Sequence, residues 1–135
     1  MIVAPRTSAA AGSPRRWTAR SRAALAEWTS LGDVGNAELF VDPATIVRNG
    51  DTATMWSIYA LKAPATAGSA TYVSLKRQDE FDCKGARMRG VQIAAYAEPM
   101  AGGKVVVEEK GTAGWAPVAP QSTGEKLLKL ACGSE

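Results

Sequence analysis

The sequence predicts an α+β fold in which one C-terminal helix packs on an antiparallel β-sheet. Three observations support this prediction. Segments with the two-residue period of β-strands fill the middle of the chain, turn signals separate them, and the period changes to that of a helix only after residue 121. Strands followed by a single helix are typical of a sheet with the helix across one face. With 135 residues, the chain is long enough for one domain with a single modest core.

The strands are expected where polar and apolar residues alternate between turn residues. They lie in residues 37–42, in a hairpin over residues 45–62, and in residues 71–83, 86–98 and 104–109, with a loop at residues 63–70 and a turn at residues 100–103. The hairpin is the clearest of these elements, because Asn49-Gly50 tolerates the positive φ angles that a type I′ turn requires. Lys84-Gly85 is expected to turn the chain between the next two strands, which therefore pair with each other.

The helix is expected at residues 122–132. Ser122 precedes Glu125 by three residues, a capping-box pattern in which each side chain accepts a hydrogen bond from the other residue's backbone N–H group. Cys132 follows Leu128 by one turn on the buried side, and Gly133 suits the position that ends a helix. The predicted apolar stripe consists of Leu127, Leu128, Leu130 and Ala131.

The positive charge is concentrated in the first 26 residues, which contain five arginines and no acidic residue. The whole chain has a net charge of +3, but residues 27–135 contain eleven Lys and Arg against thirteen Asp and Glu. Because a nucleic-acid-binding protein needs a concentrated basic surface, the sequence argues against a nucleic-acid partner. No apolar run approaches the roughly 18–20 residues of a membrane-spanning helix, so no membrane span is expected.

Residues 1–26 are expected to be a disordered segment or the remnant of an export leader, and residues 27–135 a single domain. Ala24-Leu25-Ala26 has the small-x-small form of a signal-peptidase site, but the apolar region of about 7–15 residues that should precede it is missing. Three interpretations remain open: a wrongly assigned start or a frame error upstream of a true signal peptide, a basic disordered arm, or a twin-arginine export signal. We favour the first, because the cleavage-like tripeptide lies where the strand pattern begins.

The two cysteines, Cys83 and Cys132, are expected to form a disulfide bond. The chain contains no histidine, the usual activating partner of a catalytic cysteine, and structural zinc needs four Cys or His ligands. Two free buried thiols and a catalytic or metal-binding role remain the alternatives. A disulfide would close a loop of about 49 residues, for which chain-entropy reasoning gives roughly 4 kcal/mol. It would also indicate an oxidising compartment, so the expected location is periplasmic, secreted or at the cell surface.

The same residues resemble the surface-adhesin protein E family of small exported bacterial proteins. The matching features, in chain order, are Glu27-Trp28 at the expected mature start, Trp56 in a hairpin strand, Asp82-Cys83 before basic residues, Trp115, and a leucine-rich helix that ends in Cys132. The resemblance implies an antiparallel sheet of about six strands flanked by a helix, export to the envelope and, for some members, binding of host extracellular proteins. The first residues depart from the family, because they lack its usual export signal and its lipid-attachment cysteine.

The expected function is that of a non-catalytic, adhesin-like module that binds a host extracellular or envelope protein, with no cofactor and no metal. The candidate partner-binding surface consists of Lys84, Arg87 and Arg89, to which Lys76 and Arg77 could add a basic strip. The alternative for this strip is a solvated face whose charge is neutralised by Asp79, Glu80 and Asp82. The aromatic residues that could line a groove or a homodimer interface, rather than the core, are Trp56, Tyr59, Tyr72 and Tyr96. Trp115 is expected to cover the sheet edge or to wedge under the helix.

Two other classes of protein remain as alternatives. A periplasmic carrier or inhibitor would hold a small apolar ligand or a protein loop on its sheet, and a pocket of several hundred Å³ would favour a carrier. An enzyme could use paired carboxylates such as Glu108-Glu109 or Asp79-Glu80. Catalysis is not expected, because adjacent residues of a strand point to opposite faces of the sheet.

Overall fold

The computed structural model describes residues 27–111 and 114–133 of the chain. The expected leader at residues 1–26 lies outside the described residues. The strands are β1 (Thr29–Val34), β2 (Ala37–Val41), β3 (Val47–Asn49), β4 (Thr52–Ala67), β5 (Ala70–Asp82), β6 (Arg87–Glu98), β7 (Gly102–Lys110) and β8 (Ala116–Pro117). A 3₁₀ turn, η2 (Pro43–Thr45), connects β2 to β3, and the helix α3 (Thr123–Cys132) comes last.

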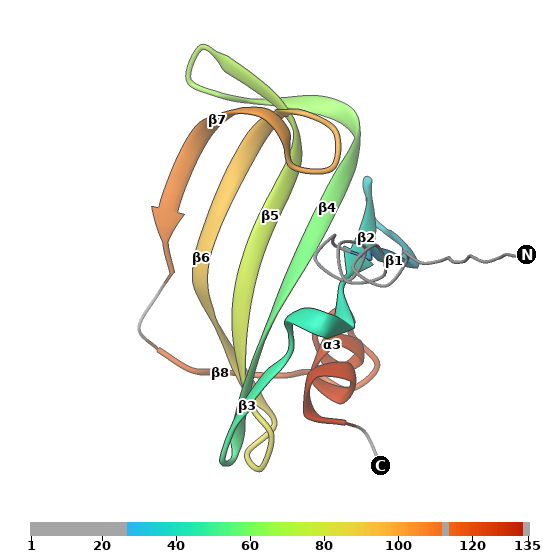
Figure 1. The fold of residues 1–135 in the computed structure, drawn as a ribbon, viewed down its shortest axis with the longest axis vertical. Coiled ribbons are helices and arrows are strands. Elements are labelled where there is room, and N and C mark those ends of the chain that lie inside the picture. Colours follow the sequence, from blue (N-terminus) through green and yellow to red (C-terminus); the bar gives the residue numbers. More distant parts are fainter. Residues whose placement is uncertain (1–26, 112–113, 134–135) are drawn as a thin grey trace, which may run out of the picture.

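The strands form one antiparallel sheet with the order β1-β2-β4-β5-β6-β7, as Figure 1 shows. Two short strands extend it at one end: β3 pairs with β4, and β8 pairs with β6. The predicted fold class, an antiparallel sheet with one C-terminal helix, is therefore confirmed. The sequence patterns did not show β1 or β8, so the described part of the sheet has eight strands instead of about six.

Two turns differ from the prediction. The loop expected at residues 63–70 is wrong, because β4 continues to Ala67 and β5 begins at Ala70, with Gly68 in the left-handed region at φ 64°. Pro64 had indicated a loop, because proline cannot donate to a β-ladder. It lies in a stretch of β4 where the register with β5 shifts, so its missing N–H group interrupts no regular ladder. The first hairpin turns one residue later than expected. Only Gly50 has positive φ (69°), which fits a type II′ turn better than type I′.

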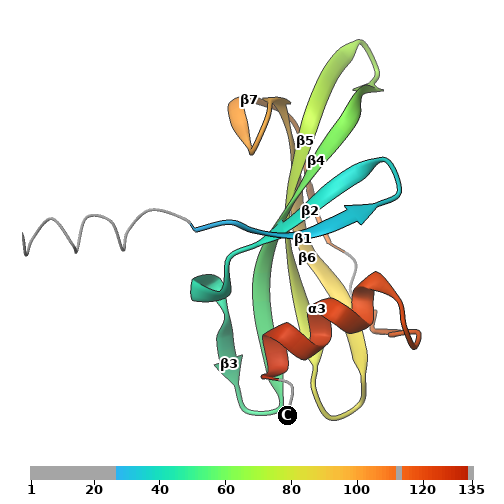
Figure 2. The same ribbon diagram turned by 90° about the vertical axis from the view of Figure 1, so that its right-hand side faces the viewer.

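One face of the sheet, which we call the helix face, packs against α3. Its buried core consists of Leu39, Val41, Ala53, Met55, Phe81, Leu127 and Ala131. Figure 2 shows α3 lying across the strands near the end of the sheet that carries β3. Because successive residues of a strand point to opposite sides, the residues between these core positions form a second face, which we call the opposite face.

The cap of α3 forms nearly as predicted. The Ser122 hydroxyl oxygen accepts a hydrogen bond from the N–H group of Glu125 at 3.2 Å. The Glu125 carboxylate accepts one from the N–H group of Gln121 at 2.6 Å, not from that of Ser122, so the reciprocal bond closes one residue earlier than in a capping box. Gly133 ends the helix with φ 71°.

The predicted stripe of α3 is too broad. Leu127 and Ala131 are buried and Leu128 packs against the core, but Leu130 is 37% exposed. The stripe prediction is wrong for Leu130, because the other three residues already define the side of the helix that faces the sheet. No helix in the described part of the chain is long and apolar enough to cross a membrane.

Candidate functional site

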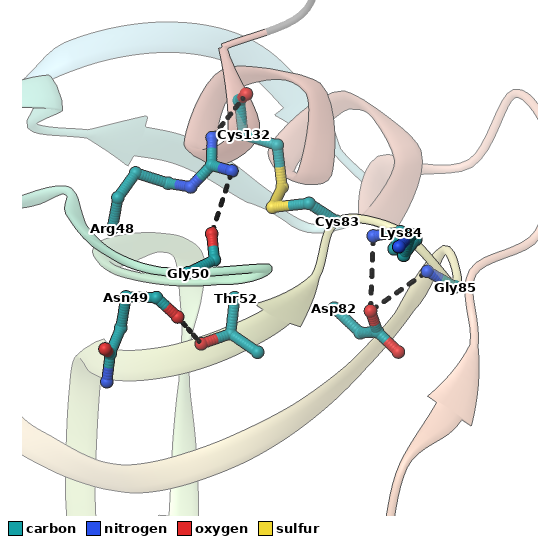
Figure 3. The surroundings of a disulfide bond; sticks show 9 residues. All are labelled: Arg48, Asn49, Gly50, Thr52, Asp82, Cys83, Lys84, Gly85 and Cys132. Carbon is teal, nitrogen blue, oxygen red and sulfur yellow. Dashed lines mark hydrogen bonds between the residues drawn. A yellow bond between two sulfur atoms is a disulfide. The ribbon is translucent and has the colours of Figure 1, made fainter.

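A disulfide bond between Cys83 and Cys132 ties the end of α3 to the end of β5, as the sequence predicted. Figure 3 shows Arg48 beside it, where the guanidinium group donates hydrogen bonds to the carbonyl oxygens of Cys132 (3.0 Å) and Gly50 (3.1 Å). The N–H group of Cys83 donates to the carbonyl oxygen of Asp51 at 2.8 Å. The β3–β4 hairpin, β5 and α3 therefore meet at one point, from which the β5–β6 turn starts.

Asp82 orders that turn. Its Oδ1 accepts hydrogen bonds from the N–H groups of Lys84 (3.2 Å) and Gly85 (2.9 Å), and its Oδ2 accepts two from the Arg87 guanidinium (2.6 and 3.0 Å). These hydrogen bonds, first the one from Gly85 and then those from Arg87, hold the pKa of Asp82 below its usual value. Lys84 is exposed in the turn that they fix.

Arginine and tryptophan side chains stack beside this turn on the opposite face. Glu80 and Arg89 lie opposite each other on β5 and β6 and form an ion pair of 2.8 Å. The guanidinium carbon of Arg89 lies 4.3 Å from the ring centroid of Trp115, and that of Arg87 lies 5.4 Å from it. Trp115 thus covers the arginines of β6. We call Lys84, Arg87, Arg89 and Trp115 the arginine–tryptophan surface.

Only three of the five basic residues in the predicted strip lie together, and all three belong to this surface. Lys76 is also on the opposite face but farther along β5, with its ammonium nitrogen 5.0 Å from the ring centroid of Trp56 and 5.9 Å from that of Trp28. Arg77 lies on the helix face, where it pairs at 2.7 Å with Asp79. The strip is therefore not continuous, since residues 76 and 77 are neighbours in a strand and point to opposite faces.

In the ion pair of Arg77 and Asp79, the carboxylate is buried and the Arg77 side chain is half-buried. Burial raises the pKa of Asp79, although Arg77 donates hydrogen bonds to both carboxylate oxygens. Burial likewise raises the pKa of Tyr59 beside them. With a side chain only about 2% exposed, Asp79 is out of reach of a substrate.

The paired carboxylates considered for catalysis are separated by the sheet. Asp79 lies on the helix face, whereas Glu80 pairs with Arg89 on the opposite face. Glu108 and Glu109 stand opposite Ala94 and Ile93 of β6 and so also point to different faces. Among the described residues, no group of three or more Cys, His, Asp and Glu side chains is arranged to hold a metal ion.

The opposite face contains a cleft of about 300 Å³ that extends from β4 to β7. It is lined by Trp56, Lys76, Gln92, Ile93, Ala94, Tyr96, Glu108, Glu109 and Lys110. A second hollow of about 210 Å³ is lined by Tyr72 together with apolar residues and Glu109. The four aromatic residues singled out in the sequence therefore do not share one groove: two line the cleft, Tyr72 lines the hollow, and Tyr59 packs against the core.

Two tryptophans have contacts that the sequence patterns did not indicate. Trp28 lies before β1, a strand that was not predicted, and its ring approaches Lys76 almost fifty positions later in the chain. Trp115 lies over arginines of β6 because β8 pairs with that strand. Neither contact has a local signal, since each depends on which distant strand lies alongside.

Comparison with known proteins agrees with the resemblance found in the sequence. The family model for surface-adhesin protein E matches residues 28–133. Crystal form II of Haemophilus influenzae protein E is 13% identical to this chain, with a TM-score of 0.62 over 82% of this chain and 97% of that one. Protein E from non-typeable Haemophilus influenzae is 14% identical, with a TM-score of 0.60 over 77% and 75%. At such identities the structural likeness shows a shared fold. No curated protein matches the chain by sequence.

Proposed function

This chain belongs to the surface-adhesin protein E family, and on that premise we propose that it is a non-catalytic, adhesin-like module that binds a protein partner outside the cytoplasm. The partner is a host extracellular protein or a protein of the bacterial envelope. The family match carries the proposal, because it extends through nearly all the described residues. The disulfide supports the location, since such bonds persist in the periplasm, at cell surfaces and in secreted proteins. Residues 1–26 as a disordered segment or the remnant of an export leader, and residues 27–135 as a single domain, belong to the same proposal.

The arginine–tryptophan surface is the proposed contact with the partner. Arginine and tryptophan are the residue types most enriched among interface hot spots. Here the ion pairs to Asp82 and Glu80 and the ring of Trp115 hold the arginines in place before any partner arrives. Binding would therefore cost less side-chain entropy than it would for free arginines. The paired charges also mean that the partner need not be strongly acidic.

A binding series with the full chain tests the proposal. The chain is immobilised, a panel of purified extracellular matrix and envelope proteins is passed over it, and dissociation constants are measured for each protein that binds. We expect Trp115→Ala and Lys84→Glu to weaken binding by roughly tenfold or more, because truncating a central aromatic or reversing a contact charge removes hot-spot energy. Lys126→Glu is the matched control, because Lys126 is exposed on α3. Binding that is unchanged in the first two variants, or a panel without any binder, would overturn the proposal.

A second candidate function, that of a small-ligand carrier, is favoured by one observation. The cleft on the opposite face has a volume at the lower end of the range for ligand pockets and combines aromatic walls with a few polar groups. It lies apart from the arginine–tryptophan surface, as the two share no residue. The two functions can therefore be tested separately.

A further inference from the structure

We infer that the cleft on the opposite face binds a small monocarboxylate that carries a single flat apolar ring. The inference rests on the second candidate function and needs no protein partner. Three features of the cleft lead to it: a floor made by a small side chain, walls made by aromatic rings, and a lysine, Lys76, whose position two tryptophan rings fix.

The floor follows from the strand register. Ile58, Lys76, Ala94 and Glu108 form one row across β4, β5, β6 and β7. Ala94 has the smallest side chain of this row, whereas the next residue of β6 on the same face is Tyr96. A short side chain between long ones leaves a depression in the sheet, so the hollow is a consequence of the alanine at this position.

The walls are suited to a flat ring. Trp56 and Tyr96 both line the cleft and both are half-buried, so each ring offers part of its surface to an occupant. Aromatic rings pair favourably with another ring in offset-stacked or edge-to-face arrangements. The volume of about 300 Å³ limits the occupant to a small molecule of this shape.

Lys76 supplies the charge. Its ammonium group is placed by the rings of Trp56 and Trp28, and no carboxylate of the described residues forms an ion pair with it. An ammonium group has three N–H donors, and a cation–π contact uses none of them for a hydrogen bond. A carboxylate at this point would accept charge-assisted hydrogen bonds from a donor that is already in position and partly removed from water.

The residues around Lys76 restrict the charge of the ligand. Glu108, which also lines the cleft, lies in the same row two strands from Lys76, roughly 10 Å away by strand spacing, and would repel a second negative charge on the ligand. Lys110, which also lines the cleft, adds a weaker attraction for a single negative charge on the ligand. The Tyr72 hollow offers a comparison: its lining contains Glu109 but no lysine or arginine, so it should reject the same acid.

The inference is tested by nuclear magnetic resonance on the full, oxidised chain. The amide signals of Ala94 and of the Gln92 side chain are followed while phenylacetate, phenylacetamide or acetate is added. Phenylacetamide keeps the ring but removes the charge, and acetate keeps the charge but removes the ring. We expect phenylacetate to shift both signals to saturation, and the other two compounds to bind at least about tenfold more weakly.

Two pairs of variants locate the site. Lys76→Gln should weaken phenylacetate binding by about tenfold or more, whereas Lys126→Gln on α3 should not. Ala94→Leu should abolish binding by filling the floor, whereas Ala63→Leu at an exposed position of β4 should not. If Ala94→Leu fails to fold, the comparison of Lys76→Gln with Lys126→Gln still tests the site. Equal binding of phenylacetamide would overturn the carboxylate assignment and leave the carrier function standing. Absence of binding by both ring compounds, or phenylacetate binding that survives Lys76→Gln, would overturn the inference.

Discussion

The two faces of the sheet are made of alternating residues from the same strands, yet different interactions hold them. On the helix face, apolar side chains such as Leu39, Met55 and Phe81 form a buried core with α3, the Arg77–Asp79 ion pair lies on the same face, and a disulfide fixes the helix. On the opposite face, carboxylates pair with arginines, rings stack on cations, and a cleft remains. Buried apolar area contributes more free energy than partly exposed ion pairs. Stability should therefore depend on the helix face, while the opposite face can adapt to binding.

The largest effect is expected in the core. Phe81 is fully buried on the helix face, and Phe81→Ala should lower the free energy of unfolding by about 3–5 kcal/mol through lost apolar transfer and a cavity. Its neighbour in β5 is the matched control: Glu80→Ala should cost no more than about 1 kcal/mol, because the Glu80 ion pair is partly exposed. Urea unfolding of both variants measures the difference. Equal losses would contradict the division of labour between the faces.

The next effect concerns the disulfide. Cys132→Ser should lower stability by about 2–4 kcal/mol in oxidising buffer, because the unfolded chain regains the freedom of the loop that the bond closes. Under full reduction the variant and the parent should nearly coincide, which separates loss of the bond from loss of the side chain. Thiol titration of the unreduced parent provides the control: two reactive cysteines there would refute the bond itself.

The parts of the molecule that could be predicted from the sequence are those with local signals. The helix, its Ser122 cap and Gly133 stop, and the cysteine pair were predicted correctly, because capping needs only neighbouring residues and a chain with two cysteines has one intramolecular pairing. The predicted end of β4 was wrong, because a strand with an irregular register can contain a proline, and the register cannot be seen in one sequence.

The candidate sites were only partly predictable for the same reason. Lys84, Arg87 and Arg89 lie close together in the chain, and the structure also brings them together. The stacking of Trp115 on two of them depends on β8, and the contact of Trp28 with Lys76 depends on β1. The cleft likewise results from side chains on four strands. Sequence periodicity assigns a residue to a face of its own strand, but it does not say which residue stands beside it on the next strand.

A smaller effect is expected from the stack on the opposite face. Trp115→Ala should reduce stability by about 0.5–1 kcal/mol, the amount typical of exposed cation–π contacts. Arg89→Lys is the informative companion, because it keeps the charge but loses the planar group that both stacks on the ring and forks onto Glu80. Thermal unfolding of both variants would measure this. A loss of stability as large as that of Phe81→Ala would show that the opposite face contributes as much to stability as the buried core does.

The smallest effects are expected in the pH dependence of stability, where two carboxylates of β5, Asp79 and Asp82, should behave in opposite ways. Asp82 has a pKa below its usual value of 3.8, so its ionised form favours folding. That stabilisation is present above pH 3.8 and is lost as the pH falls through the lowered pKa of the folded state. Asp79 has a raised pKa, so its ionised form disfavours folding relative to the protonated one. The folded state then gains stability as the pH falls through the raised pKa towards 3.8.

Asp82→Asn and Asp79→Asn should therefore differ from the parent in opposite ways. The stability advantage of the parent over Asp82→Asn should shrink as the pH drops below about 3.8, because only the parent loses an ionised, hydrogen-bonded carboxylate. The difference between the parent and Asp79→Asn should instead move in favour of the parent as the pH falls towards 3.8 from above. Urea unfolding across that range measures both slopes. Slopes of the same sign would contradict the opposite pKa shifts of Asp79 and Asp82.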